Sequence, residues 1–300
     1  MQLNRSPLKW AGSKARIMET LRQHLPAGKR LVEPFAGSCS VMLNTDYDEY
    51  LITDINADLI NFYNIAKRET SELINLASSL FMTANTAAQY YEFRNVFNTG
   101  NSDALRRAVI FLYLNRHCFN GMCRYNQSGG FNVPYGKYKA PYFPEAEIHF
   151  FAEKAKNATF LCCDFSETLN MTVPGDVVYC DPPYIPTSKT ADFTHYHTDG
   201  FTDDDQRRLA LALVNTADNG CKVVVSNSDT PRAAELYALF AVHSITAPRS
   251  ISCKGDGRQK VQEIIATMSP LQWIGFDPSG GLDSTVIHEM PDRHNTAGEK

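Results

Sequence analysis

The sequence predicts an α/β protein, in which short buried strands alternate with helices around an open sheet. Two observations lead to this prediction. Short apolar runs recur along the 300 residues, and several of them end at an acid. The alternation is interrupted between about residues 57 and 145, where helical patterns precede an irregular basic stretch. We therefore expect a sheet domain formed by residues 1–56 and 145–270, an inserted region at 57–144 and an irregular C-terminal tail at 271–300.

The most informative strand is the apolar run 177–180, which is followed by Asp181-Pro182-Pro183-Tyr184. Its valines and tyrosine predict a buried strand. Because proline lacks an N–H group and fixes φ, the strand must end there. A carboxylate and an aromatic ring are thus expected at the carboxyl end of a strand, which is where open α/β sheets bind ligands. For Pro-Pro alone, an ordinary turn with an incidental acid would be the simpler interpretation.

Other predicted strands also end at small or acidic residues. The strand 30–33 leads into a turn with Gly37, and the pattern after this turn predicts a helix. The strand at 50–54 ends at Asp54, which is placed either to bind ribose hydroxyls or to cap the next helix. A further strand, 159–164, ends at Asp164. Because Gly37 stands alone, the G-x-G-x-x-G fingerprint of nicotinamide enzymes is absent.

The rest of the chain gives weaker signals. Residues 17–25, 59–67, 72–80 and 106–114 have helical spacing, and Thr202 is expected to cap a helix that runs to residue 214. Residues 222–227 predict another buried strand, and 241–246 pairs with 261–267. Loop 185–201 is expected to be mobile and to close over a site. Arg249, Lys254, Arg258 and Lys260 form a second basic loop.

Composition limits the possible functions. A net charge of −4 argues against a protein that coats nucleic acid, although local charge still permits DNA binding. Eight cysteines occur without a C-x-x-C pair, and the N-terminus is polar, so we expect reduced thiols in the cytoplasm. We expect neither a membrane span nor a metal site, since His195 and His197 have no further ligands nearby.

A basic stretch without acids runs from residue 105 to residue 140. Its cations are Arg106, Arg107, Arg116, Arg124, Lys137 and Lys139, and they alternate with aromatic and asparagine residues. Arginine pairs with guanine, asparagine pairs with adenine, and an aromatic ring can wedge into a gap in the base stack. A solvated basic surface is the alternative. The lack of compensating acids favours DNA binding.

Taken in order, several motifs resemble the Dam family of DNA adenine-N6 methyltransferases. They are Leu-Lys-Trp-Ala-Gly at 8–12, Val-Glu-Pro-Phe at 32–35, Leu-Tyr-Leu-Asn-Arg at 112–116, Phe-Asn-Val-Pro at 131–134, Asp-Pro-Pro-Tyr at 181–184 and Arg-Ser-Ile-Ser at 249–252. Their shared order is far more specific than any single motif. The resemblance implies a seven-stranded, mostly parallel Rossmann-like sheet with helices on both faces, and an inserted, mainly helical DNA-recognition domain. The tail matches nothing in this pattern.

The resemblance also implies ligands and residue roles. S-adenosyl-L-methionine would bind near Trp10, Ala11, Lys14, Glu33, Pro34, Phe35, Gly37, Ser38, Asp54, Asp164 and Asp181. Catalysis would fall to Asp181, Pro182, Pro183 and Tyr184. Double-stranded DNA, at GATC, would contact Lys9, Arg116, Phe119, Asn120, Met122, Arg124, Asn126, Asn132, Pro134, Lys137, Tyr138, Lys139 and Arg249. Phe119 and Met122 depart from the Tyr and Leu of the family pattern, which would alter base flipping or the tolerance of near-GATC sites.

The implied reaction is a direct methyl transfer to adenine N6. The base leaves the duplex, Phe119 fills the gap, and Tyr184 stacks on the base. The Asp181 carboxylate and the Pro182 carbonyl accept the N6–H bonds, without a covalent intermediate or a metal. We expect a monomer near the bacterial or phage nucleoid. The alternatives are a cytosine-N4 enzyme, which more often has Ser at position 181, an RNA or protein methyltransferase, and a catalytically silent DNA-binding protein.

Overall fold

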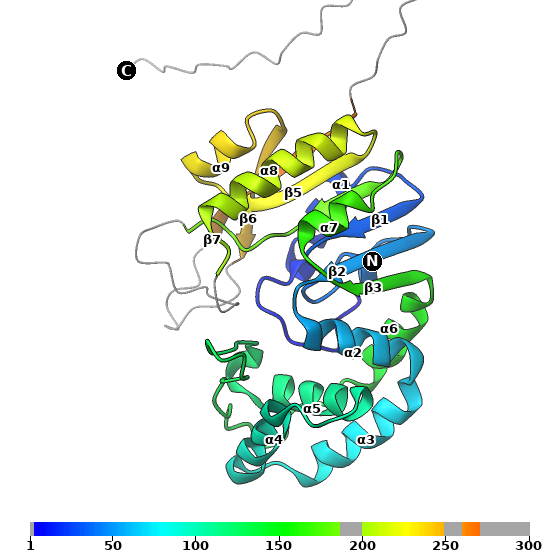
Figure 1. Cartoon of the computed structure of the whole chain (residues 1–300), viewed down its shortest axis with the longest axis vertical. Coiled ribbons are helices and arrows are strands. Elements are labelled where there is room, and N and C mark those ends of the chain that lie inside the picture. The colour runs from blue at the N-terminus through cyan, green and yellow to red at the C-terminus, as the bar shows by residue number, and fades with distance from the viewer. Residues whose placement is uncertain (1–2, 187–199, 249–259, 271–300) are drawn as a thin grey trace, which may run out of the picture.

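Seven strands form one sheet in the computed structural model, which describes residues 3–186, 200–248 and 260–270 (Figure 1). The order across the sheet is β3-β2-β1-β4-β5-β7-β6, and β7 is antiparallel to both of its neighbours. The strands are β1 Arg30–Glu33, β2 Glu49–Asp54, β3 Ala158–Cys162, β4 Val177–Cys180, β5 Lys222–Ser228, β6 Ala241–Pro248 and β7 Lys260–Met268. The predicted seven-stranded, mostly parallel sheet is confirmed.

The strand order reverses between β1 and β4. These two strands are parallel neighbours, with Leu31 opposite Val177 and Val32 opposite Val178. The chain runs outward from β1 to β2 and β3, and later from β4 to β5. A crevice for ligands forms at such a switch point, outside the carboxyl ends of the strands. The loops after Glu33 and Cys180 therefore open side by side.

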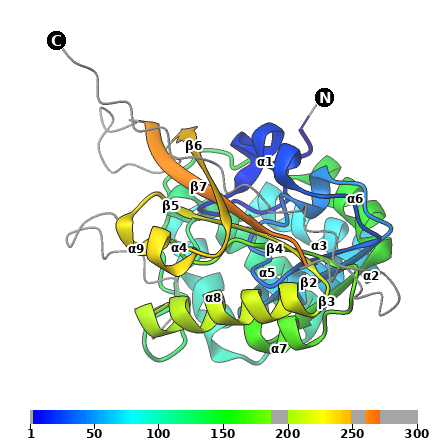
Figure 2. The ribbon, with the colours of Figure 1, turned by 90° about the horizontal axis from the view of Figure 1, so that it is seen from above.

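Helices cover both faces of the sheet. Figure 2 shows α7 (Phe165–Asn170) and α8 (Asp203–Asp218) on one side, and α1 (Met18–His24) and α6 (Glu145–Lys154) on the other. Val178, Val223 and Val225 pack with Leu209 and Leu213 of α8 in one apolar cluster, which also includes Ala233 of α9 (Pro231–Leu236). The opposite face packs against α1, α2 (Ala57–Arg68) and α6.

The inserted region is built around one buried helix. Helix α5 (Ala104–His117) is buried at every position from 108 to 117, and α3 (Thr70–Thr83) and α4 (Ala87–Thr99) pack against it. Figure 1 shows these three helices at the end of the molecule away from α8 and α9. Phe97 and Phe111 belong to the same apolar cluster as Leu31 and Ile52 of the sheet. The insertion and the sheet thus share one core.

Helix α2, which lies within the predicted insertion 57–144, packs against α5 and also bonds to the sheet. Lys67 Nζ donates to the Ala158 carbonyl at 2.8 Å, and Asn64 Nδ2 donates to the Phe160 carbonyl at 3.3 Å. After α5, residues 118–144 are irregular apart from the short 3-10 helix η3 (Phe119–Gly121) and the isolated bridges Cys118 to Tyr135 and Tyr125 to Phe131.

Several local predictions can be compared with the structure. The Thr202 cap is present as a capping box with Asp205, and α2, α3 and α5 cover the helical patterns. The helix predicted after Gly37 forms only as the short 3-10 helix η2 (Met42–Asn44), after positive φ values of 45° at Gly37 and 53° at Cys39. Two further 3-10 helices, η1 (Lys14–Arg16) and η4 (Ala155–Asn157), lie beside the sheet.

Three predictions fall outside the described residues. They concern the closing loop, most of which is 187–199, the second basic loop at 249–259 with Arg249, and the tail at 271–300. Within the described part of the chain, no helix is long and apolar enough to cross a membrane.

Candidate active site

The centre of the candidate site is an ion pair at the carboxyl end of β4. Lys14 Nζ lies 2.6 Å from Asp181 Oδ2 and 2.5 Å from Asp181 Oδ1. The same nitrogen donates to the Gly12 carbonyl at 3.0 Å and lies 4.8 Å from the centroid of the Tyr184 ring. Lys14 is buried, so its charge is paired here rather than solvated. The pair joins the N-terminal segment to the end of β4.

The second support of Asp181 comes from the adjacent strand β5. Ser226 Oγ lies 3.3 Å from Asp181 Oδ1 and 2.8 Å from the hydroxyl of Tyr179. Ser226 is fully buried, as is Asn227 beside it. Burial raises the pKa of Asp181, and the charge of Lys14 opposes this shift. The Asp181 side chain itself remains partly exposed.

The hydroxyl group of Tyr184 is fixed by a residue of strand β7. This hydroxyl donates to Glu263 Oε2 at 3.0 Å, and burial raises the pKa of both groups. Glu33, at the end of β1, is 2 % exposed, and its Oε1 has no hydrogen-bond partner in the described structure. Burial raises the pKa of Glu33 to about 8, and the charge of Asp181 adds to this effect. The charge of Lys14 acts on both Asp181 and Glu263, and Glu33 lies close enough to Asp181 to be affected by its charge.

The predicted cofactor residues surround the loop after β1. A Cβ atom on Gly37 would lie 3.2 Å from Cδ1 and Nε1 of Trp10, so the absence of a side chain lets the indole lie against this loop. The Gly37 N–H donates to Asp54 Oδ2 at 3.1 Å, and the Gly37 carbonyl accepts from the hydroxyl of Tyr63. Asp54 does not cap α2, because Asn56 accepts from the N–H groups of Asp58 and Leu59.

Phe35 points toward the other side of the sheet from Trp10. Its ring stacks on Phe165 at a centroid distance of 5.7 Å and meets the edge of Phe201 at 5.8 Å. Pro34 and Ser38 are buried, and Ser38 Oγ lies 2.7 Å from Ser40 Oγ. Ala11 precedes Gly12, whose carbonyl holds Lys14. These residues shape the loop through their backbone and packing.

Asp164 is already engaged by protein groups. Its Oδ1 accepts from the Ser166 N–H at 3.0 Å, where it caps α7, and Arg208 binds both of its oxygens at 3.0 and 3.3 Å. These bonds hold the pKa of Asp164 below its usual value, although burial acts in the opposite direction. The free protein thus uses this carboxylate to join α7 and α8.

Lys9 links the candidate site to the inserted region. Its backbone N–H and carbonyl each make a 2.8 Å hydrogen bond with the side-chain amide of Asn115. Its Nζ lies 4.5 Å from the centroid of the Tyr138 ring. Gly121 has no space for a Cβ atom because the Lys9 side chain lies against it. Burial lowers the pKa of Lys9.

Phe119 stands out from the inserted region. Its side chain is 50 % exposed, whereas Phe131 of the same region is 1 % exposed. The Phe119 N–H donates to the Pro134 carbonyl at 2.8 Å, and Asn120 has a positive φ of 55°. The Asn120 N–H donates to the Tyr138 hydroxyl at 3.2 Å. Phe119 therefore does not belong to the core of the inserted region.

The predicted DNA-binding residues divide by exposure. Arg124 is exposed, and its Nε donates to Asn132 Oδ1 at 2.8 Å. Lys137, Lys139 and Pro134 are exposed, and Met122 packs partly against the core. Asn126 accepts from the N–H groups of Ser128 and Gly130 and so stabilises a turn.

One of these predictions requires correction. Arg116 is 7 % exposed, and its Nε and Nη2 donate to the Pro7 carbonyl at 2.9 and 2.5 Å. Its guanidinium lies 5.7 Å from the centroid of the Tyr142 ring. Arg116 therefore holds the N-terminal segment in place instead of facing solvent, as a DNA contact would require. Its neighbour in the basic stretch, Arg107, is paired with Asp58.

Sequence reasoning gave no site role to several residues near the site, among them Glu263, which binds the Tyr184 hydroxyl. Asn115 and Ser226 bind functional segments as described above, and Gln206 and Asn227 contact the turn after Asp181. A signal was available for Ser226 and Asn227, since they are polar residues at the end of an apolar strand. No sequence signal distinguishes Gln206 on α8.

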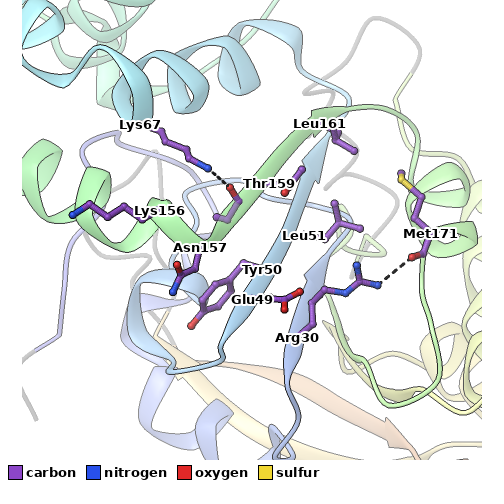
Figure 3. A pocket seen from close by; sticks show the side chains of 11 residues that line it. Arg30, Glu49, Tyr50, Leu51, Lys67, Lys156, Asn157, Thr159, Leu161 and Met171 are labelled. Carbon is purple, nitrogen blue, oxygen red and sulfur yellow. Dashed lines mark hydrogen bonds between the residues drawn. The ribbon is translucent and has the colours of Figure 1, made fainter.

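A hollow of about 410 Å³ lies elsewhere, beside the amino-terminal ends of β1, β2 and β3 (Figure 3). Its cations already have partners, because Arg30 binds Asp176, Lys67 binds the Ala158 carbonyl, and Lys156 pairs with Glu153. The hollow therefore offers no unpaired charge to a ligand. Among residues 3–186, 200–248 and 260–270, no group of three His, Cys, Asp or Glu side chains could hold a metal ion.

Fold and site together define a methyltransferase that acts on an amine, with Asp-Pro-Pro-Tyr at the switch point of a mostly parallel sheet. The chain belongs to the family of D12 class N6 adenine-specific DNA methyltransferases, whose model matches residues 10–251. The protein is thus an adenine-specific DNA methyltransferase, and the resemblance seen in its motifs is confirmed.

The chain aligns with nearly the whole length of three relatives. It is 53 % identical over 285 residues to the Retron Ec67 DNA adenine methylase of Escherichia coli, and the alignment covers 94 % of this chain and 98 % of the relative. It is 50 % identical to the DNA adenine methylase of Serratia marcescens, over 89 % of this chain and 99 % of the relative. It is 48 % identical to the DNA adenine methylase of Escherichia coli K12, over 90 % of this chain and 97 % of the relative.

Proposed function

We propose that this enzyme transfers a methyl group from S-adenosyl-L-methionine to N6 of adenine in double-stranded GATC, after flipping the base out of the duplex. The main support for this proposal is the position of the Asp181 carboxylate after the end of β4. Lys14 forms an ion pair with this carboxylate and lies over the Tyr184 ring. A carboxylate and an aromatic face at a sheet switch point suit an amine on a planar base.

The donor set of the site fits this cofactor. Asp181 and Glu263 lie close to Lys14, and Glu33 beside Asp181 has a buried oxygen without a hydrogen bond. These acceptors would suit the sulfonium and ammonium groups of S-adenosyl-L-methionine. Trp10 lies against the Gly37 loop, and the Gly37 N–H donates to Asp54. The bound cofactor supplies an electrophilic methyl carbon.

The protein groups then act on the adenine amine. The Asp181 carboxylate and the Pro182 carbonyl accept the two N6–H bonds, which turns the nitrogen lone pair toward the methyl carbon. When bound, S-adenosyl-L-methionine would supply the methyl group that the N6 lone pair displaces from sulfur, and Asp181 would accept the proton that N6 releases. Lys14 must leave at least one Asp181 oxygen for this contact. Reacting atoms held about 3–3.5 Å apart make such a displacement efficient.

Base flipping is supported by the inserted region. Phe119 is half exposed beside the left-handed residue Asn120, in a surface that carries Arg124, Lys137 and Lys139. An exposed ring can fill the space that a base vacates. In this proposal, Lys9, Arg124 and Tyr138 read bases, and Lys137 and Lys139 bind phosphates. We further propose a monomer that acts on the bacterial or phage nucleoid.

The decisive experiment expresses the protein in a methylation-deficient host. Plasmid DNA from these cells is digested with GATC nucleases, one blocked by adenine methylation and one dependent on it. We expect resistance to the first nuclease and cleavage by the second. Full sensitivity to the first, with soluble protein present, would refute GATC methylation. Calorimetry with S-adenosyl-L-methionine tests the cofactor separately.

A further inference from the structure

A closed ring of hydrogen bonds passes through the turn that carries Tyr184. The Ile185 N–H donates to Asn227 Oδ1 at 3.0 Å, and Asn227 Nδ2 donates to Gln206 Oε1 at 3.3 Å. Gln206 Nε2 donates in turn to the Pro183 carbonyl at 2.7 Å. The ring therefore begins at one backbone neighbour of Tyr184 and ends at the other.

The direction of the ring is fixed by its acceptors. Asn227 Oδ1 also accepts from the Ser228 N–H at 2.8 Å, so two N–H groups point at this oxygen. The Asn227 nitrogen must then face Gln206, whose own nitrogen is left to donate to Pro183. A flipped Gln206 amide would set oxygen against oxygen. Both side chains are buried, Gln206 at 3 % and Asn227 at 0 % exposure, so a broken bond leaves an unpaired group.

The ring connects the turn to rigid elements. Gln206 lies on the first turns of α8, and Asn227 lies near the end of β5. Ser228 Oγ adds a 2.7 Å bond to the Ile185 carbonyl. The Tyr184 hydroxyl is fixed separately by Glu263. The backbone of the turn and the end of the tyrosine ring are thus held by different elements.

We propose that Gln206 is a positioning residue for methyl transfer, which acts with Asn227 through the Pro183 carbonyl to orient Tyr184 and the Pro182 carbonyl toward the target base. The inference rests on the proposed function of that turn. Gln206 itself does not touch the base. Its effect comes from geometry, since a displacement of about 1 Å at reacting groups costs about 10²-fold in rate.

The sharpest test is Gln206→Glu, which keeps the size of the side chain and the acceptor for Asn227. When the carboxyl group of the variant is ionised, its second oxygen has no proton to donate. The hydrogen bond to the Pro183 carbonyl is then lost. At about pH 8 we expect kcat to fall about 10²-fold, with the KM values for GATC DNA and S-adenosyl-L-methionine within about threefold of the wild type. Near pH 6 the buried carboxyl group gains a proton and can donate again, so the deficit should shrink.

Two further variants complete the experiment. Gln206→Met removes donor and acceptor, and its kcat deficit should not recover at low pH. Gln23→Glu makes the same charge change at an exposed position of α1 and should match the wild type throughout.

The outcomes separate the inference from the function on which it rests. An unchanged kcat in folded Gln206→Glu overturns the positioning role, as does a loss that only follows the unfolded fraction measured by circular dichroism. A deficit without pH dependence in Gln206→Glu overturns it as well. A wild type that transfers no methyl group refutes the proposed function instead.

Discussion

The side-chain amide of Asn115 makes two hydrogen bonds, each 2.8 Å long, with the backbone N–H and carbonyl of Lys9. Asn115 is 1 % exposed and lies on the helix at the centre of the inserted region. Lys9 directly precedes Trp10, whose ring lies against the Gly37 loop. One amide thus fixes the backbone at Lys9, the proposed DNA contact, which is bonded directly to Trp10, the proposed cofactor contact.

Asn115→Ala should therefore affect both ligands. We expect weaker S-adenosyl-L-methionine binding and poorer discrimination against near-GATC sites, together with a stability loss of about 1–3 kcal/mol from the unpaired backbone groups. Calorimetry and competition kinetics measure the two effects. Asn75→Ala, an exposed change on α3, is the control. An effect on only one ligand would show that the segment does not couple the sites.

Phe119→Ala and Phe131→Ala form a matched pair at 50 % and 1 % exposure. Phe131→Ala should cost about 3–5 kcal/mol of stability, whereas Phe119→Ala should stay within about 0.5 kcal/mol. Only Phe119→Ala should reduce the fluorescence rise of 2-aminopurine at the target position. A full flipping signal in folded Phe119→Ala would exclude the wedge.

Substitutions of Arg124 and Lys137 should have different effects on DNA binding, because one is the proposed base contact and the other the proposed phosphate contact. Arg124 is oriented by Asn132, so Arg124→Ala should lose discrimination at one guanine, by about 1–3 kcal/mol. Lys137→Ala should weaken binding evenly across sequences and flatten its salt dependence. Binding to GATC and to single-base variants at several salt concentrations separates the two. Identical specificity profiles would contradict this division of base and phosphate contacts.

Asp181→Ala should abolish methyl transfer and leave most DNA binding, because the carboxylate acts on N6 and not on phosphates. The change also leaves Lys14 buried and unpaired, so stability should fall by about 3–5 kcal/mol. Adding Lys14→Met should restore much of this stability without restoring activity. Transfer of labelled methyl groups and fluorescence anisotropy measure the two functions. A turnover rate in Asp181→Ala equal to that of the wild type would show that Asp181 takes no part in methyl transfer.

Glu33 predicts a pH dependence of stability. Its pKa is raised from 4.5 to about 8, so between these values the folded protein holds a proton that the unfolded chain has lost. The contribution is complete below pH 4.5 and is lost as the pH rises through 8, with a slope of at most about 1.4 kcal/mol per pH unit. Urea unfolding of Glu33→Gln should lack this slope. Glu72→Gln on α3 should keep it, and parallel curves for Glu33→Gln and the wild type would refute the shift.

The sequence was sufficient for elements whose ends carry strong chemical signals. Pro182 ends β4, and Thr202 begins α8, as predicted. Helix α4 was missed because its apolar pattern is sparse, with Tyr90 and Phe97 as its buried residues. The helix expected after Gly37 forms only as the 3-10 helix η2, and the left-handed backbone of Cys39 before it could not be predicted from local preference.

The site shows the same limit. Acids at strand ends indicated Asp54, Asp164 and Asp181, but only the packing of α7 and α8 shows that Arg208 engages Asp164. Arg116 and Arg124 lie in one basic stretch and look alike in sequence. The structure separates them, because Arg116 lies in the buried last turn of α5, whereas Arg124 is exposed.

The core shared by the insertion and the sheet restricts how such an enzyme can diversify. Phe97 and Phe111 pack in one cluster with Leu31 and Ile52, so the insertion cannot be exchanged between homologues as a self-contained cassette without disturbing the strands. We therefore expect target recognition to change more readily through substitutions at exposed positions such as Arg124, the proposed base contact, than through exchange of the whole insertion.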